Sequence, residues 1–558
     1  MAAPVTLGAL ADAHALVLAP GAPGASGTGA ASGTTWRDLP VSGVRQDNRQ
    51  IRGGELFVAV PGLHVHAARF AAAAAAAGAV AVLTDAEGAT LAAGVPVPVL
   101  TPADGRPETL IALLGALAAD ICGHPARRLT GFAVTGTNGK TTVAYMVDHI
   151  LTSLGRTTGL VGTVEVRIAG RGEPAVLTTP QAVDLQTMLA TMVDAGVTDL
   201  TMEVSSHALA LGRVDTVRYA VAGFTNLTQD HLDFHPTFED YFAAKAALFD
   251  AARTGRAVVL LDDAWGRRLH REIAERRGPG EAVPLAVFPD DPDAARPART
   301  DGWWVESVRE VAARTAGTGG TSDAPRQGPA EPRARSEFTV RHADGRVLHT
   351  ETDLPGAFNV ANAALAAVMV IESGVPVARV QAALDAHGGV SPRVPGRMEV
   401  LAEQPRVIVD FAHNPGALAA ALETLRPSTS GRLVVLFGAA GERDRAKRPD
   451  MGRLAVLGAD EVIVTDDDPH DEPADQIRAE VLAGTVEVPD ARADVVREIV
   501  PREAAILCAV LQARDEDTVL VAGRGHETVQ DLAGVAHPLD DRVEVRSALA
   551  RRAQEKSR

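Results

Sequence analysis

Residues 131–142 join a short apolar run to a turn that contains two glycines and a lysine. The run Gly131-Phe-Ala-Val134 predicts a buried strand, and Thr135-Gly-Thr-Asn-Gly-Lys-Thr-Thr142 predicts a tight turn that opens a helix. Such a unit belongs to parallel α/β sheets, where backbone N–H groups and a lysine ammonium bind phosphate. The full phosphate-loop pattern has glycine where this chain has Val134, so the segment matches the shorter Gly-x-x-Gly-Lys-Thr form. An incidental glycine turn is the alternative, but strand, glycines, lysine and a threonine hydroxyl coincide here.

Lysine is rare in this chain. Of its 54 basic residues only four are lysines, at positions 140, 245, 447 and 556, so arginine supplies most of the positive charge. Lys245 lies in the apolar segment Tyr241-Phe-Ala-Ala-Lys-Ala-Ala-Leu-Phe249, where a surface lysine with a buried stem is the default interpretation. A lysine amine can also react with carbon dioxide to give a carbamate, an anionic oxygen ligand that arginine cannot form. Lys245 is therefore a candidate for that chemistry.

Composition limits the classes of partner. A chain of 558 residues is too long for one core and predicts about three or four domains. The net charge of −17 argues against nucleic acid and anionic membranes. Two cysteines, Cys122 and Cys508, favour a reducing compartment, and the first basic residue is Arg37, so no secretory signal is evident. The apolar run 71–83 is too short to span a bilayer. We expect a cytoplasmic protein with no membrane span, which we take to be a monomer.

Strand and helix patterns alternate along three blocks, residues 1–124, 125–388 and 389–558. Segments 20–35 and 315–335 are low-complexity insertions that we expect to be poorly ordered. Nearly continuous Val, Ile and Leu strands between helices predict parallel sheets covered on both faces. The predicted strands include 55–60, 79–83, 131–134, 200–204, 220–224, 257–261, 407–410, 433–437, 461–464 and 518–522.

Unusual polar clusters follow many of these strands. Ligands of parallel sheets bind beyond the carboxyl ends of the strands, so the clusters predict a site in a cleft between two domains. Glu203 ends a buried strand, where an ionised carboxylate must be paired, hydrogen-bonded or bound to a metal. With Thr141 it would hold the Mg²⁺ that accompanies ATP, and His231 offers a further ligand. A salt-bridged strand-end acid and a structural histidine are the alternatives.

Several of these motifs together resemble the Mur ligases, the ATP-dependent amide-forming enzymes of peptidoglycan precursor synthesis. The resemblance covers roughly residues 40–550 and is strongest for the branch that adds a diamino acid. It implies a small N-terminal α/β UDP-binding domain, a central P-loop parallel-sheet ATPase domain and a C-terminal Rossmann-like domain. The matching segments are 136–142, 202–207, 226–233, 243–245, 354–362, 395–399 and 410–415.

The resemblance also implies roles for individual residues. Lys140, Glu203, His231 and a carbamylated Lys245 would be catalytic, with Thr141 and Glu203 on one Mg²⁺ and His231 and Lys245 on a second. ATP would be bound by Gly136, Thr137, Asn138, Gly139, Lys140, Thr141, Thr142 and Asn362. The UDP-muramoyl-dipeptide would be bound by Asn48, Arg49, Thr178, Thr179, Ser205 and Arg213, with Leu211 where some relatives have glutamine. The amino acid would be bound by Arg443, Asp467, Asp468, Pro469, His470, Gly523 and Glu527.

The implied substrates are UDP-N-acetylmuramoyl-L-alanyl-D-glutamate and a free diamino acid, joined through an acyl phosphate. Enzymes specific for meso-diaminopimelate typically have Asp-Asn-Pro-Arg where this chain has Asp467-Asp-Pro-His470. A mostly neutral histidine replaces arginine poorly at a carboxylate, and Asp466 to Asp468 suit an ammonium group. We therefore predict L-lysine or L-ornithine; meso-diaminopimelate, with Arg443 or Arg524 reaching its distal carboxylate, stays the alternative.

Three other hypotheses compete. Another ligase of the same fold, such as a folylpolyglutamate synthase or the dipeptide-adding Mur ligase, is disfavoured by the joint occurrence of segments 47–49, 441–444 and 523–527. A scaffold that has lost catalysis would show decay at Lys140, Glu203, His231 or Lys245, and all four are present. A transport or motor ATPase would use the phosphate loop but would leave the loop set of the third block unexplained.

Overall fold

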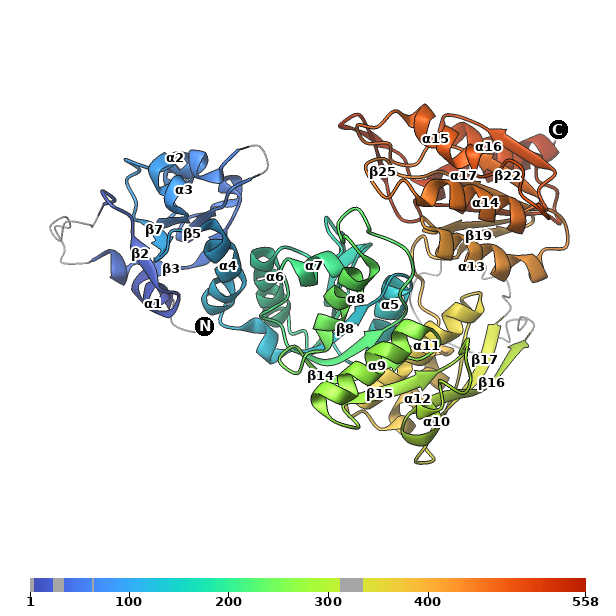
Figure 1. Ribbon diagram of the computed structural model, residues 1–558, viewed down its shortest axis with the longest axis horizontal. Coiled ribbons are helices and arrows are strands. Elements are labelled where there is room, and N and C mark those ends of the chain that lie inside the picture. Colours follow the sequence, from blue (N-terminus) through green and yellow to red (C-terminus); the bar gives the residue numbers. More distant parts are fainter. Residues whose placement is uncertain (1–4, 24–34, 63–64, 312–334, 558) are drawn as a thin grey trace.

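The computed structural model describes residues 5–23, 35–62, 65–311 and 335–557, and its strands form three main sheets. Figure 1 shows three units in chain order, with the C-terminal unit lying against the central one. The N-terminal unit meets the central one through helix α4 (Pro107–Ile121), which packs on α6 (Ala182–Asp194). Three α/β domains confirm the predicted fold class. Most of the two predicted insertions lies outside the described residues, and Arg335 already belongs to a strand.

The N-terminal sheet has the order β2-β7-β6-β5-β4. Its strands are β2 (Leu16–Leu18), β4 (Gly43–Arg45), β5 (Glu55–Ala59), β6 (Ala81–Thr84) and β7 (Val99–Pro102), all parallel except β2. Side chains of β5 alternate between two cores: Leu56 and Val58 pack with α1 (Leu7–Ala13) and α4, while Phe57 and Ala59 pack with α2 (Ala71–Ala76). The strand is therefore buried on both faces, as its unbroken apolar sequence predicts.

The central sheet has eleven strands in the order β11-β10-β9-β12-β8-β13-β14-β15-β16-β17-β18. The seven from β9 to β16 are parallel, but β10, β11, β17 and β18 are antiparallel additions at the two edges, which the strand–helix alternation did not predict. The parallel strands are β8 (Thr130–Thr135), β9 (Thr158–Val161), β12 (Asp199–Glu203), β13 (Tyr219–Phe224), β14 (Thr254–Leu260), β15 (Ala282–Ala286) and β16 (Trp303–Val311). The antiparallel strands are β10 (Glu165–Ile168), β11 (Arg171–Pro174), β17 (Arg335–His342) and β18 (Val347–Thr352).

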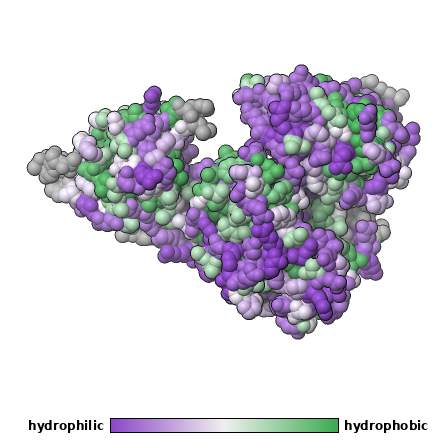
Figure 2. Space-filling model, in the orientation of Figure 1, coloured by the Kyte–Doolittle hydropathy of each residue, from purple (hydrophilic) through white to green (hydrophobic). Residues whose placement is uncertain are grey.

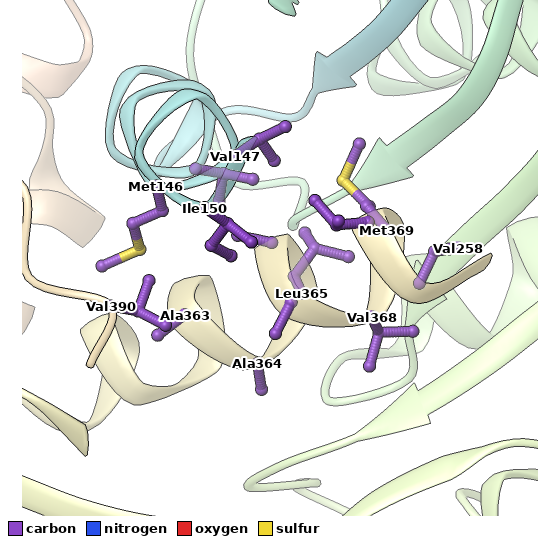
Figure 3. Close-up of a cluster of buried hydrophobic side chains, with 14 of the residues drawn as sticks. Met146, Val147, Ile150, Val258, Ala363, Ala364, Leu365, Val368, Met369 and Val390 are labelled. Carbon is purple, nitrogen blue, oxygen red and sulfur yellow. The ribbon is translucent and has the colours of Figure 1, made fainter. Parts of the chain in front are cut away.

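Helices cover both faces of the central sheet. Helices α5 (Lys140–Ser153) and α11 (Ala357–Glu372) pack on one face, where Ile150 of α5 and Leu365 of α11 belong to the cluster of buried side chains in Figure 3. Gly223 of β13 allows this close approach, since a Cβ there would overlap the Met369 sulfur. The other face is covered by α6 (Ala182–Asp194), α7 (Ser206–Ala210), α8 (Phe238–Ala246) and α9 (Ala264–Arg277).

The C-terminal sheet has the order β19-β20-β24-β21-β22-β23, parallel except for β19. Its strands are β19 (Glu399–Glu403), β20 (Arg406–Asp410), β21 (Leu433–Phe437), β22 (Glu461–Val464), β23 (Val495–Glu498) and β24 (Thr518–Ala522). One face carries α13 (Pro415–Leu425), α14 (Lys447–Gly458) and α15 (Ala474–Ala483), and the other carries α16 (Arg502–Gln512) and α17 (Asp541–Lys556). Across the described part of the chain, no helix has both the length and the apolar character needed to cross a membrane.

Truncation of Leu365 should destabilise the central domain, because its side chain is fully buried between α5 and the sheet. We expect Leu365→Ala to lower the free energy of unfolding by about 2–5 kcal/mol. The control Leu211→Ala removes a side chain that is 51% exposed and should change it by less than about 0.5 kcal/mol. Tryptophan fluorescence during denaturation reports this domain, which contains Trp265, Trp303 and Trp304. Equal effects of the two variants would contradict this packing.

Candidate active site

The glycine-rich turn between β8 and α5 forms a cradle of backbone N–H groups. Gly139 has φ +88° at the start of α5, and a Cβ on it would lie 2.6 Å from Asn362 Oδ1 of α11. The loop after β13 supports the turn, because Asn226 accepts from the Thr137 and Asn138 backbone N–H groups at 2.9 and 3.0 Å. The predicted ATP residues of the loop and Asn362 therefore lie together.

Two lysines share one acceptor beneath this cradle. Lys140 Nζ donates to the Gly136 and Thr137 carbonyls at 3.0 and 2.9 Å, and Lys245 Nζ donates to the same Gly136 carbonyl at 2.7 Å. Lys245 is 1% exposed and lies over the Tyr241 ring, so it is not the surface lysine of the default interpretation. Burial lowers the pKa of Lys245 well below its usual range, and the neighbouring Lys140 lowers it further. An amine in this position is disposed to be neutral, the form that reacts with carbon dioxide.

Glu203 is fully buried at the carboxyl end of β12. Its carboxylate accepts hydrogen bonds from Thr141 Oγ1 at 2.9 Å, from Thr163 Oγ1 at 3.0 Å and from the Thr163 N–H at 2.8 Å. A carboxylate held by hydroxyls beside a phosphate cradle is a hard oxygen donor set, which fits Mg²⁺. The structure thus brings the two predicted ligands of the first metal into contact.

Arg397 reaches this pair from the C-terminal domain. Its Nη2 donates to Thr141 Oγ1 at 3.3 Å, and its guanidinium stacks 4.2 Å from the Phe411 ring centre. The motif that contains Arg397 matches the family, but nothing in its local pattern predicts a contact with a residue 256 positions away. Arg397 is a site residue that the sequence interpretation missed.

The loop after β13 carries a histidine beside a buried acid. His231 has φ +54°, and its Nε2 lies 3.8 Å from Asp230 Oδ2. Burial lowers the pKa of His231 to about 3, so the ring is neutral at pH 7 and keeps a lone pair for a metal. Burial alone would raise the pKa of Asp230, but the hydrogen bond and charge of His413 outweigh it and hold that pKa well below its usual range.

Four of the residues predicted for the UDP-muramoyl-dipeptide cluster beside Glu203. Thr179 Oγ1 donates to the Glu203 carbonyl at 2.9 Å, and Arg213 donates to the Thr179 carbonyl at 3.2 Å. Ser205 caps α7 and donates its backbone N–H to Thr179 Oγ1 at 3.1 Å, while Thr178 accepts from Thr163 at 3.1 Å. The other two, Asn48 and Arg49, lie in the N-terminal domain, where the Arg49 side chain pairs with Asp47 and is 84% exposed. Figure 2 shows a hollow between the N-terminal and C-terminal domains, above the central one.

The predicted amino-acid residues lie at the carboxyl ends of β22 and β24. Carboxylate oxygens of Asp467, Asp468 and Glu527 lie within 4.8 Å of one another. Arg524 is fully buried and donates to Asp468 at 2.6 Å, with Glu527 at 3.8 Å and Asp467 at 4.0 Å. Burial and the neighbouring Asp467 raise the pKa of Glu527 to about 8. Gly523 has φ +111° and allows Asp467 to approach, because a Cβ there would lie 2.5 Å from its Oδ2.

The charge of this loop differs from the prediction. Asp466 pairs with Arg478 and Asp468 with Arg524, so two of the three aspartates are neutralised by arginines. His470 stands where enzymes specific for diaminopimelate typically have an arginine. Its Nδ1 lies 3.2 Å from Asp531 Oδ2, so the imidazole already has a carboxylate partner within the protein. The prediction of a strongly acidic loop, which favoured lysine or ornithine, is therefore wrong for this site. A cation remains available in Arg443, whose side chain is 54% exposed and 3.9 Å from Asp233.

Polar contacts join the C-terminal domain to the phosphate cradle. Asn414 Nδ2 donates to Asn138 Oδ1 at 3.0 Å, and Gln229 donates to Asp444 at 3.0 Å. His413 also lies 3.5 Å from Asp230. The predicted ATP, metal and amino-acid residues thus line one junction between two domains, as the strand-end clusters predict.

Sequence profiles identify the family. Profiles described as Mur ligase middle domain, glutamate ligase domain and catalytic domain match residues 134–280, 396–525 and 40–109. A protein from Streptomyces avermitilis named UDP-N-acetylmuramoyl-L-alanyl-D-glutamate–2,6-diaminopimelate ligase is 42% identical, with 92% of this chain and 94% of that protein aligned. The chain belongs to the Mur ligase family. It is accordingly an ATP-dependent ligase that forms a carbon–nitrogen bond, which confirms the predicted family and enzyme class.

Two further comparisons extend the similarity. A protein from Leifsonia xyli named UDP-N-acetylmuramyl-tripeptide synthetase is 40% identical, with 92% of both chains aligned. A solved structure of a UDP-N-acetylmuramoyl-L-alanyl-D-glutamate–2,6-diaminopimelate ligase is 29% identical and superimposes with a TM-score of 0.58 over 94% of this chain and 97% of that one. The three-domain arrangement of this Mur ligase is therefore shared along nearly its whole length.

The cradle geometry predicts different results for two glycines that flank α5. Gly139 and Gly155 both have positive φ, +88° and +76°, but only Gly139 would place a Cβ against Asn362; nothing lies within 4 Å of a Cβ at Gly155. We expect Gly139→Ala to weaken nucleotide binding about tenfold or more, equivalent to about 1.4 kcal/mol. Gly155→Ala shares the backbone strain, about 1–3 kcal/mol, and should keep nucleotide affinity. Titration calorimetry with a non-hydrolysable ATP analogue checks both; unchanged affinity in Gly139→Ala would contradict the assigned cradle.

Proposed function

We propose that this Mur ligase adds meso-diaminopimelate to the D-glutamate of UDP-N-acetylmuramoyl-L-alanyl-D-glutamate. The observation that carries the proposal is the 42% identity, over 92% of the chain, with a ligase named for these substrates. The relatives favour this alternative over the predicted lysine or ornithine, although the name of the Leifsonia xyli protein specifies no amino acid. The pairing of Asp466 and Asp468 with arginines supports it, because it removes the main electrostatic argument for a lysine-type substrate.

The residues around the cradle fit ATP and Mg²⁺. Thr141 and Glu203 offer hydroxyl and carboxylate oxygens to one ion, and neutral His231 offers a nitrogen near Lys245 for a second. Bound Mg²⁺ would neutralise charge on the transferring phosphoryl group. Lys140 and Arg397 add two cations at the same place, one from each domain. A carbamate on Lys245 would convert the buried amine into an anionic ligand, which gives the buried lysine a function.

The cluster beside Glu203 suits the dipeptide end of the nucleotide substrate. Arg213 and the hydroxyls of Thr178, Thr179 and Ser205 can bind its carboxylate and amide groups next to the cradle. An oxygen of the glutamyl carboxylate then attacks the γ-phosphorus of ATP, ADP leaves, and an acyl phosphate forms. The amine of the amino acid attacks the acyl carbon, phosphate leaves, and the nitrogen loses a proton. An acyl phosphate hydrolyses in water, so the polar contacts of Asn414 with Asn138 have a role in closing the junction.

The amino acid would lie between two charged groups. Arg443 is exposed and suits a substrate carboxylate, whereas Asp467 and Glu527 suit an ammonium group. Glu527 has its pKa raised to about 8, so an arriving ammonium would favour its ionised form. Pro469, His470 and Gly523 would shape the remaining wall.

Phosphate release tests the assignment directly. The purified enzyme with ATP, Mg²⁺ and the UDP-muramoyl-dipeptide should release phosphate on addition of meso-diaminopimelate, and at least tenfold less with L-lysine or L-ornithine. A response to lysine or ornithine alone would overturn the proposed amino acid and keep the ligase. No phosphate release with any of the three amino acids would overturn the proposed function.

The ligase reaction should require the amine of Lys245. We expect Lys245→Arg to reduce the rate at least 10³-fold, because a guanidinium forms no carbamate; such a loss corresponds to about 4 kcal/mol. Lys245→Ala should be equally impaired and partly restored by acetate or propionate, which supply the missing carboxylate. Lys556→Arg is the control, since Lys556 is exposed in the last helix and pairs with Asp515 on the surface. Full activity of Lys245→Arg would exclude the carbamate.

A further inference from the structure

Arg502 is a fully buried arginine at the start of α16. Its guanidinium donates through Nε and Nη2 to Asp541 at 2.8 and 2.7 Å, and neither side chain of this pair is exposed. A cation at a helix N-terminus opposes the helix dipole, and a buried ion pair is costly to desolvate. Burial alone would lower the pKa of Arg502, but Asp541 outweighs it and holds the guanidinium charged. Stability is therefore a poor explanation for this choice of residue.

The remaining donors of Arg502 point to the amino-acid loops. Nη1 donates to the Asp466 carbonyl at 3.0 Å, and Nη2 donates to the Ala522 carbonyl at 2.8 Å. Asp466 directly precedes Asp467 to His470, and Ala522 directly precedes Gly523 to Glu527. In the sheet order, β24 and β22 are separated by β21, so the strand ladder gives these two loops no direct pairing. The Arg502 guanidinium connects the backbones of the two loops at the carboxyl end of the sheet, and the side-chain pair of Arg524 with Asp468 lies beside it.

We propose that Arg502, held by Asp541, is a positioning residue that fixes the spacing between the two loops that bind the diamino acid. The inference rests on the proposed function for the identity of the ligand, but the connection between the loops is independent of which diamino acid is used. Arg502 contacts neither the residues assigned to ATP nor those assigned to the dipeptide. Its replacement should therefore weaken binding of the amino acid and leave the formation of the acyl phosphate unchanged.

The opposite end of the same strands offers a control pair. Where β21 and β24 begin, Arg432 Nη2 lies 2.9 Å from Asp517 Oδ2; the Asp517 side chain is 1% exposed and that of Arg432 is 39% exposed. Neither residue contacts an amino-acid loop among the described contacts. A loss of stability in this domain should not change the KM of one substrate selectively, whereas a loss of positioning should raise the KM of the amino acid alone.

The experiment compares Arg502→Lys and Asp541→Asn with Arg432→Lys and Asp517→Asn in the full chain. For the first two variants, we expect the KM of whichever diamino acid the wild type uses to rise at least tenfold, with the KM values of ATP and the UDP-substrate within twofold. Acyl phosphate trapped by hydroxylamine without amino acid should be unchanged. For the control variants, all three KM values should stay within twofold, whatever the loss of melting temperature.

Hydrogen exchange gives a readout that does not depend on activity. Amides of residues 466–470 and 523–527 should exchange faster in the Arg502 and Asp541 variants and at the wild-type rate in the two controls. An unchanged amino-acid KM, equal changes in all substrates, or unchanged exchange in both loops would each overturn the positioning role. A wild type that uses no diamino acid would overturn the proposed function instead, and exchange would then decide the positioning role alone.

Discussion

The rest of the active site depends on the hydrogen bonds that the buried carboxylate of Glu203 accepts. A charge at the end of a central strand must be satisfied, and here three hydrogen bonds from Thr141 and Thr163 do so. Those two threonines come from the start of α5 and from the loop after β9, so one acid fixes the phosphate cradle relative to the loop that leads to the dipeptide residues. Thr179 binds the carbonyl of the same glutamate. The cation Arg397 then reaches Thr141 from the other domain.

Parallel sheets explain why two domains meet at this carboxylate. The loops at the carboxyl ends of the central and C-terminal strands carry the polar side chains, and Asn138 with Asn414 and Gln229 with Asp444 join them across the junction. These contacts are hydrogen bonds between polar groups, and Phe358 of α11 adds an apolar contact with the C-terminal core. Such a junction is typical of domains that move relative to each other. A closing motion suits a reaction whose intermediate must be kept from water.

The sequence predicted what is encoded locally and missed what depends on pairing across the chain. Strands, the phosphate cradle and the position of Glu203 follow from short patterns, and the structure has them within a few residues of the predicted bounds. The antiparallel edge strands β10, β11, β17 and β18 were missed, because half-buried edge strands lack the unbroken apolar pattern of central ones. The predicted preference for lysine or ornithine failed for the same reason, because it depended on a contact between distant parts of the chain. Three consecutive aspartates suggest an acidic loop, but Arg524 lies 56 positions from Asp468 in the chain and nothing local announces the pair.

The unequal use of arginine and lysine reflects two different demands on a buried cation. Among the described residues of the C-terminal domain, the fully buried arginines are Arg448, Arg502 and Arg524, and each is held by carboxylates or carbonyls. A guanidinium stays charged under all conditions and presents several donors in one plane, so it makes a rigid connection between loops. Lysine can lose its proton when buried, and Lys140 and Lys245 both have lowered pKa values beside one carbonyl. Arginine thus suits positions where geometry must be fixed, whereas Lys140 and Lys245 offer a compact point charge and an amine at the cradle.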